Sequence, residues 1–219
     1  MTASIGKFLS SVVIGWEEIE PPLLANLAMR YPFILIGRHG IAKSAFAKSI
    51  SRIFGEEGFR FYDATKDDLI SIAGIPKPES LTQDGRTLEF AKHSRTIWDA
   101  KFVVIDELTR ANRDNQNMWL EILQEHKLYG TPLVYEIAIA TMNPESYAAT
   151  FKLDEALLDR FYAVIPVPEL QDDTPEEVYK RIIELDLRNG REAADLDGVL
   201  KAIDSIRAIE TDLRASTET

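Results

Sequence analysis

The sequence contains no cysteine, only three histidines and no apolar run long enough to cross a bilayer. The lack of cysteine excludes disulfides and thiolate metal sites. The histidines, His39, His93 and His126, lack the i, i+4 spacing of a helical metal pair. No basic N-terminal segment precedes a long apolar one, as it would in a signal peptide. Together these absences predict a soluble, cytoplasmic protein without a membrane span.

Positive charge is also scarce, because 25 Lys and Arg residues face 36 Asp and Glu, giving a formal net charge of -11. Affinity for nucleic acid comes largely from cations that neutralise phosphates, so this balance makes nucleic acid an unfavourable main partner. The chain of 219 residues is 45% hydrophobic, which is enough for one domain core with a small appendage.

Apolar segments with the length of buried strands alternate with helical patterns along the chain. The expected strands are YPFILI (31–36), FRFYDA (59–64), KFVVID (101–106), YEIAIATMN (135–143) and YAVIPVP (162–168). The expected helices include 42–55, 112–127, 153–161 and 175–190, whereas 67–90 looks irregular apart from a hairpin turning at Asp84-Gly85. This alternation predicts an α/β fold with a mostly parallel central sheet flanked by helices, which binds ligands at the carboxyl ends of its strands.

The stretch GRHGIAKS, residues 37–44, nearly matches a phosphate-binding loop, with Ala42 where the pattern has glycine. A strand before it and a helix after it would aim backbone N–H groups at one point. Lys43 would then reach the β- and γ-phosphates, and Ser44 would offer a hydroxyl to Mg²⁺. A Cβ at Ala42 is harmless if that residue has helical backbone angles, so the substitution need not abolish binding. The alternative is an ordinary strand–turn–helix join with a surface lysine.

Three further polar groups follow or lie near apolar strands. Asp106 and Glu107 end the strand FVVID, where a pair of acids can hold Mg²⁺ and activate water, although a solvated strand end also explains one acid. Asn143 ends another strand and fits either a turn or a contact with water or phosphate. Arg160 reads as a surface arginine unless a partner subunit brings it a phosphate.

Read in order, these pieces resemble the AAA+ ATPases and, more narrowly, their MoxR family. The resemblance spans about residues 9–185 and rests on VVIGWEEI (12–19), the hairpin-like LTQDGRTLEF (81–90), DELTRAN (106–112), IATMNP (139–144) and KLDEALLDRF (152–161). The form of the phosphate loop is most similar to that of the regulatory ATPase variant A branch. The resemblance implies a ring, usually a hexamer, with ATP and Mg²⁺ at the subunit interfaces.

Carried over position by position, the resemblance implies roles for individual residues. Catalytic roles fall to Glu107, to the sensor Asn143 and to Arg160 as a finger for the neighbouring subunit, while Ser44 and Asp106 would contact the metal. Cofactor binding falls to Gly37, His39, Gly40, Ile41, Ala42, Lys43, Ser44, Ala45, Ile14 and Gly15. The family also suggests a chaperone-like role in maturing protein complexes, and a partner with a von Willebrand factor type A domain.

The chain departs from the family pattern at its C-terminal end. The resemblance implies a helical lid with a second sensor arginine beyond residue 190, and few residues remain to build it. We therefore expect residues 1–168 to form the AAA+ core, and residues 169–219 to form a C-terminal helical segment with the lid truncated or missing.

Three functions remain open on the sequence. The first is an ATP-hydrolysing ring motor that remodels or matures protein complexes. The second is a nucleotide-binding scaffold with little hydrolysis. The third is a nucleic-acid-remodelling or GTP-using AAA+ relative.

Overall fold

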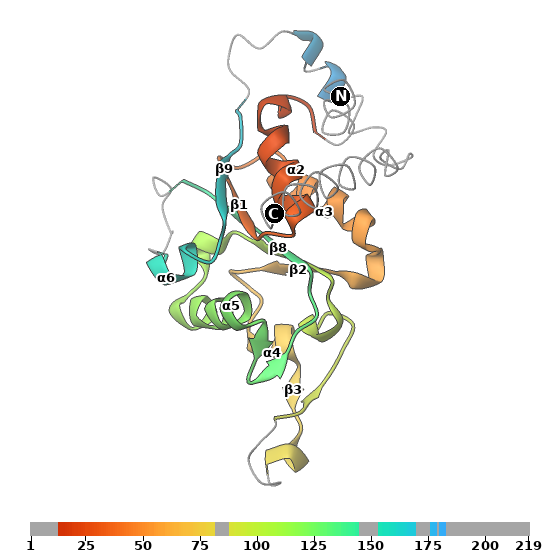
Figure 1. Ribbon diagram of the computed structural model, residues 1–219, viewed down its shortest axis with the longest axis vertical. Coiled ribbons are helices and arrows are strands. Elements are labelled where there is room, and N and C mark those ends of the chain that lie inside the picture. Colours follow the sequence, from red (N-terminus) through yellow and green to blue (C-terminus); the bar gives the residue numbers. More distant parts are fainter. Residues whose placement is uncertain (1–12, 82–87, 145–152, 170–175, 179, 183–219) are drawn as a thin grey trace, which may run out of the picture.

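The computed structural model describes residues 13–81, 88–144, 153–169, 176–178 and 180–182, and a five-stranded sheet lies at its centre (Figure 1). All neighbouring strands are parallel, in the spatial order β2-β5-β8-β1-β9. These strands are β1 (Phe33–Ile36), β2 (Phe59–Asp63), β5 (Phe102–Asp106), β8 (Ile137–Met142) and β9 (Ala163–Pro166). The α-helices are α2 (Glu20–Met29), α3 (Lys43–Phe54), α4 (Leu69–Ala73), α5 (Arg113–Glu125) and α6 (Glu155–Leu158).

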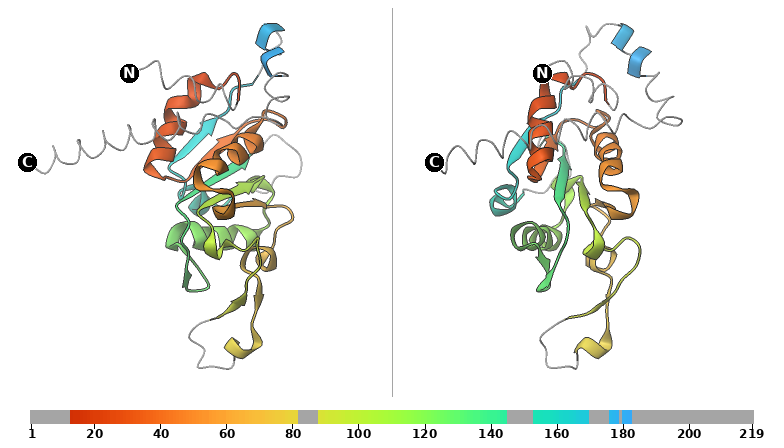
Figure 2. Two further views of the ribbon diagram at one scale, coloured as in Figure 1. Left: turned by 90° about the vertical axis from the view of Figure 1, so that its right-hand side faces the viewer. Right: turned by 45° about the vertical axis from the view of Figure 1, so that its right-hand side comes forward.

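Helices cover both faces of the sheet, so the core has two halves. Helices α2 and α3 pack on one face, and α4, α5 and α6 lie on the other (Figures 1 and 2). Along β5, Phe102 and Val104 point to the α2–α3 side, while Val103 and Ile105 point to the α5 side. This alternation explains the continuous apolar strands, because a strand covered on both faces has no solvent side.

Smaller elements lie outside this frame. The ribbon pair β3 (Ile75–Pro76) and β4 (Phe90–Ala91) is antiparallel and projects away from the sheet (Figure 2), and β6 (Lys127–Leu128) pairs with β7 (Thr131–Pro132). Single 3₁₀ turns are η2 (Glu17–Ile19), η3 (Glu56–Gly58), η4 (Pro78–Leu81), η5 (Ile97–Asp99) and η6 (Leu108–Arg110).

The α/β class and the parallel sheet expected from the sequence are confirmed, with all five strands near their expected positions. One expectation needs correction. The stretch 67–90, expected to be irregular, contains the helix α4. The expected turn at Asp84-Gly85 lies outside the described residues, as does the region of the expected lid, so the division at residue 168 stays a prediction.

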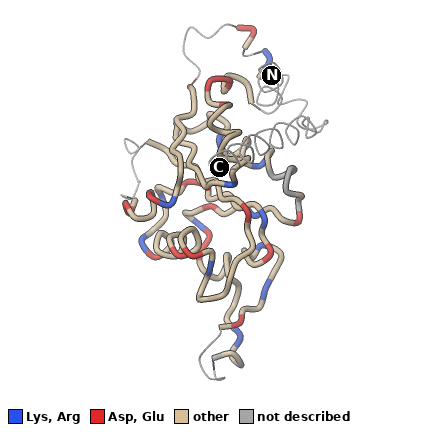
Figure 3. The backbone as a smooth tube through the Cα atoms, in the orientation of Figure 1, with Lys and Arg blue, Asp and Glu red and all other residues tan. Residues whose placement is uncertain are grey.

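The described surface carries charges of both signs, with Lys and Arg interspersed among Asp and Glu along the backbone (Figure 3). Within the described ranges, no helix is both long and apolar enough to cross a membrane.

Candidate functional site

Three adjacent strands bring the site together at their carboxyl ends. Strand β8 lies between β1 and β5, so the segments that follow these strands meet at one edge of the sheet. A pocket of about 260 Å³ opens there. Its lining residues are His39, Gly40, Ile41, Ala42, Lys43, Ser44, Ala45, Asp106, Glu107, Thr141 and Asn143. Residues more than 60 positions apart in sequence thus share one cavity, as the strand order requires.

Lys43 is the buried cation of this pocket, and its side chain folds back over the loop. Its Nζ donates to the carbonyl oxygens of Gly37 and Arg38, both at 2.6 Å, and to Asn143 Oδ1 at 3.2 Å. Burial lowers the pKa of Lys43, while the nearby Asp106 and Glu107 carboxylates act in the opposite direction. The ammonium group is therefore held beside the pocket by neutral oxygens that an anion could replace.

Asp106 anchors a short chain of hydroxyl groups. Ser44 Oγ donates to Asp106 Oδ1 at 2.7 Å, and Thr141 Oγ1 donates to the same oxygen. Thr141 Oγ1 in turn accepts the backbone N–H of Glu107 at 3.1 Å. Asp106 is thus hydrogen-bonded to Ser44 of the phosphate loop on one side and to Thr141 of β8 on the other.

Glu107 sits on a strained backbone at the start of η6. Its φ of 55° and ψ of 43° lie in the left-handed region, which is unfavourable for residues other than glycine and is enriched at functional sites. Arg110 Nη1 lies 3.1 Å from Glu107 Oε2, and His39 Nδ1 lies 3.8 Å from Oε1. The carboxylate is therefore held by a cation three residues further on, at the rim of the pocket.

The phosphate loop turns through two residues with positive φ. Gly40 has a φ of 81°, as a glycine turn allows. Ala42, the residue before α3, has a φ of 63° and a ψ of 15°. The condition of helical angles at Ala42 is therefore not met, because the chain enters α3 through a left-handed residue. The Cβ that replaces the glycine of the pattern carries a conformational cost.

Several predicted residues do not line the pocket. Ile14 and Gly15 lie before η2 and are half-buried, and the neighbouring Trp16 packs on Phe46 in the core, 5.0 Å between ring centroids. Gly37 contacts the site through its carbonyl oxygen, which accepts a hydrogen bond from Lys43 Nζ.

Arg160 lies at the opposite end of the parallel strands from the pocket, where the strands begin. It stands between α6 and the first residue of β9, where the N–H of Tyr162 donates to Pro32 just before β1. The pocket begins where β1 ends, so at least the length of a four-residue strand, about 13 Å, separates the two levels. Arg160 Nε is buried without a hydrogen-bond partner. Within one chain, Arg160 does not reach the pocket.

Two residues at or beside the pocket escaped the sequence reasoning. Thr141 is the polar residue one step before the end of an otherwise apolar strand, and its hydroxyl donates to Asp106, one residue beyond the last pair of the β5–β8 register. Arg110 pairs with Glu107 of its own chain, a contact that residue spacing alone does not reveal.

The donor set suits a magnesium nucleotide. Ser44 Oγ and Asp106 Oδ1 are hard oxygen ligands, and magnesium typically takes one or two protein carboxylates while phosphates and water complete its shell. In the described ranges, no group of three or more His, Cys, Asp or Glu could hold a metal by itself. The geometry therefore fits a metal that arrives with phosphate.

An all-parallel sheet in this strand order, with a phosphate loop after β1 and acids after β5, defines the AAA+ P-loop fold. Residues 32–161 match the family described as AAA domain (dynein-related subfamily). Because the match spans more than half of the 219 residues, the chain belongs to this family.

Two curated relatives are similar to the chain. It is 26% identical over 161 residues to the uncharacterized protein YeaC of Bacillus subtilis, and 24% identical over 180 residues to the chaperone MoxR1 of Mycobacterium tuberculosis. The matches cover 71% and 78% of this chain but 48% and 45% of those proteins, so the chain spans about half their length. The resemblance to MoxR-type AAA+ ATPases is confirmed.

A solved structure shows the same fold. The crystal structure of a predicted ATPase from Cytophaga hutchinsonii has a TM-score of 0.58 and 23% identity to this chain. It covers 90% of this chain, and the chain covers 59% of it.

Proposed function

We propose that the chain is an ATP-hydrolysing, magnesium-dependent subunit of a MoxR-type ring. One observation carries this proposal: Lys43, Ser44, Asp106, Glu107 and Asn143 line a single pocket although they come from three separate strand ends. Similarity to other proteins in fold alone would not require these five side chains to line one pocket.

The loop and its lysine bind the triphosphate. The first residues of α3 line the pocket, where a helix N-terminus favours an anion, and Lys43 exchanges its carbonyl partners for phosphate oxygens. The loop residues assigned to this role are Gly37, His39, Gly40, Ile41, Ala42 and Ala45, with Ile14 and Gly15 assigned to the adenine side. Ser44 and Asp106 hold Mg²⁺. When bound, this ion neutralises charge that develops on the phosphate oxygens.

Glu107 is the general base of the reaction. Its carboxylate takes a proton from the attacking water while Asn143, held by Lys43 at 3.2 Å, fixes the position of that water or of the γ-phosphate. Arg160 belongs to the site of the neighbouring subunit, which fits its distance from the pocket of its own chain.

The biological role is proposed from the relatives. A chaperone is among them, which supports remodelling or maturation of protein complexes by a homo-oligomeric ring, with six subunits and a von Willebrand factor type A partner as the family expectation. The cytoplasm is the proposed compartment.

Turnover of ATP, measured per subunit against protein concentration, tests the proposal. Turnover should rise as subunits assemble, and both Glu107→Gln and Arg160→Ala should lower it by at least about 100-fold. Arg113→Ala, which changes an exposed arginine at the start of α5, serves as the matched control. Tight nucleotide binding without turnover at any concentration contradicts the proposal.

A second candidate is a nucleotide-binding scaffold with little hydrolysis. The observation that favours it is the Arg110–Glu107 ion pair at 3.1 Å, which occupies an oxygen of the proposed base. For this candidate, Glu107→Gln leaves both the low turnover and the nucleotide affinity unchanged. Parallel titrations with ATP and GTP decide whether the site prefers adenine or guanine nucleotides.

A further inference from the structure

The imidazole of His39 lies at the centre of the polar side chains on one wall of the pocket. Its Nε2 is 3.0 Å from Asn143 Nδ2 and 3.3 Å from Arg110 Nη2, and its Nδ1 is 3.8 Å from Glu107 Oε1. The side chain is about half exposed. His39 therefore contacts groups from the ends of β5 and β8, although it belongs to the loop that follows β1.

The hydrogen bonds define which ring nitrogen carries the proton. Lys43 can only donate, so Asn143 must present Oδ1 to Lys43 and its Nδ2 donors to His39. Arg110 also has only donors. Since both neighbours of Nε2 donate, Nε2 accepts and the ring is neutral with its proton on Nδ1, the nitrogen nearest Glu107.

The same contacts connect His39 to the carboxylate of Glu107. Arg110 uses Nη2 toward His39 and Nη1 toward Glu107 Oε2, so one guanidinium group bridges the imidazole and the acid. A guanidinium group is planar and rigid, hence fixing one nitrogen restricts the other. The acceptor on His39 thereby restricts where the Glu107 carboxylate can lie.

We propose that His39 is a positioning residue for Glu107 and Asn143, acting through Arg110. Through these contacts, the position of the phosphate loop determines the position of Glu107 after the end of β5. This side-chain role is separate from the triphosphate contact proposed for the loop, because Nε2 accepts from two protein donors and the protonated Nδ1 faces the Glu107 carboxylate at 3.8 Å. The proposal rests on the proposed hydrolysis for its catalytic consequence, but the contacts themselves can be tested without it.

Two substitutions separate positioning from binding. His39→Ala removes the acceptor, so we expect kcat to fall about tenfold while the dissociation constant for the magnesium nucleotide changes by less than about threefold. His39→Gln places an amide oxygen near the position of Nε2 and should recover most of the loss. His93→Gln, at an exposed histidine away from the pocket, is the matched control.

Kinetic results can overturn the proposal in three ways. The role is wrong if His39→Ala keeps kcat within twofold of the wild type, or if His39→Gln is no better than His39→Ala. A larger change in nucleotide affinity than in kcat identifies His39 as a binding residue instead.

A spectroscopic measurement tests the arrangement without turnover. The chain has three histidines, so nitrogen-15 labelling of histidine gives three sets of ring signals, and His39→Gln identifies the set of His39. In the nucleotide-free protein at neutral pH we expect a protonated Nδ1 and an unprotonated Nε2, and Arg110→Ala should shift the Nε2 signal. A ring protonated on Nε2 overturns the contacts. Absence of wild-type turnover overturns the hydrolysis and the catalytic consequence, while this spectrum still decides the contacts.

Discussion

Ala42 is the residue at which the loop differs from its pattern and also a residue under backbone strain. Its φ of 63° lies where an L-amino acid costs roughly 1–2 kcal/mol relative to the right-handed helix. Glycine removes this cost at the loop position where the phosphate-loop pattern has it. The chain has kept an unfavourable residue next to Lys43, so stability alone does not explain the choice.

Ala42→Gly should stabilise the nucleotide-free protein by about 0.5–1 kcal/mol, because the left-handed conformation suits glycine. Ala45→Gly is the matched control. It makes the same change three residues further on, at an exposed position inside α3, where glycine should destabilise by a similar amount. Urea unfolding of both variants measures the two effects. Destabilisation by both substitutions would show that the left-handed angle at Ala42 is not maintained in solution.

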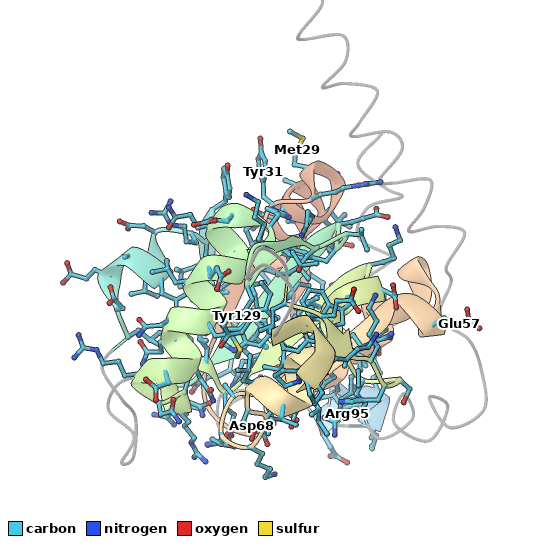
Figure 4. All side chains as sticks on the ribbon, turned by 90° about the horizontal axis from the view of Figure 1, so that it is seen from below. Met29, Tyr31, Glu57, Asp68, Arg95 and Tyr129 are labelled. Carbon is cyan, nitrogen blue, oxygen red and sulfur yellow. The ribbon has the colours of Figure 1, made fainter. Side chains whose placement is uncertain are left out.

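At the scale of single elements, side-chain caps determine where three helices begin. Asp68, Asn112 and Asp154 each accept a backbone N–H from the first turn of α4, α5 and α6. Helix α4 has only five residues and is marginal by itself, so its cap matters most. Asp68 lies at the exposed end of this helix (Figure 4) and also accepts from the Ser71 hydroxyl at 3.0 Å.

Asp68→Ala should therefore lower the free energy of unfolding by about 0.5–1 kcal/mol at neutral pH. Hydrogen bonds from the backbone N–H and then the hydroxyl of Ser71 lower the pKa of Asp68 below the usual 3.8. Because the folded pKa is depressed, this contribution is present above pH 3.8 and is lost as the pH falls through the folded pKa.

Chemical unfolding of the Asp68 variants at pH 7 and near pH 3 measures this dependence. Asp68→Ser is the control, since serine keeps a capping oxygen and loses the charge. Equal stability of Asp68→Ala and the wild type at neutral pH contradicts the assigned cap.

Elements with a clear apolar pattern could be predicted from the sequence, while those without one could not. The five core strands are continuous apolar runs because both of their faces are covered, and helices α3 and α5 show apolar periodicity because each buries one face. Helix α4 and the β6–β7 pair are too short to show a period. The positive φ of Ala42 and Glu107, and the pairing of Arg110 with Glu107, depend on tertiary contacts that leave no mark in residue spacing. The convergence of Lys43 and its neighbours was predictable because parallel strands end at a common edge.

At the scale of the whole molecule, the pocket lies where the parallel strands end, and Arg160 lies where they begin. A site that needs both must therefore combine two copies of the chain. In the proposed ring, Glu107 would come from one copy and Arg160 from the next.

Two inactive variants should therefore restore activity when mixed. In a ring assembled at random from Glu107→Gln and Arg160→Ala subunits, about a quarter of the interfaces join an intact Glu107 to an intact Arg160. Turnover of the mixture should reach about this fraction of the wild-type value, measured after subunit exchange at matched total concentration. A mixture no more active than its components, despite proven exchange, would place Arg160 outside the neighbouring site.

The position of β1 in the sheet has a consequence for synthesis on the ribosome. Phe33 pairs with Ile139 on one side and with Ala163 on the other, so β1 emerges long before either neighbouring strand exists. The loop after β1 is fastened by bonds from the Gly37 N–H to Met142 and from the Val167 N–H to Ile36. A nascent chain thus carries its phosphate loop without these bonds until residue 167 has left the exit tunnel, and contacts so distant in sequence form slowly. The segment that gives the family its signature is therefore among the last to take its final shape.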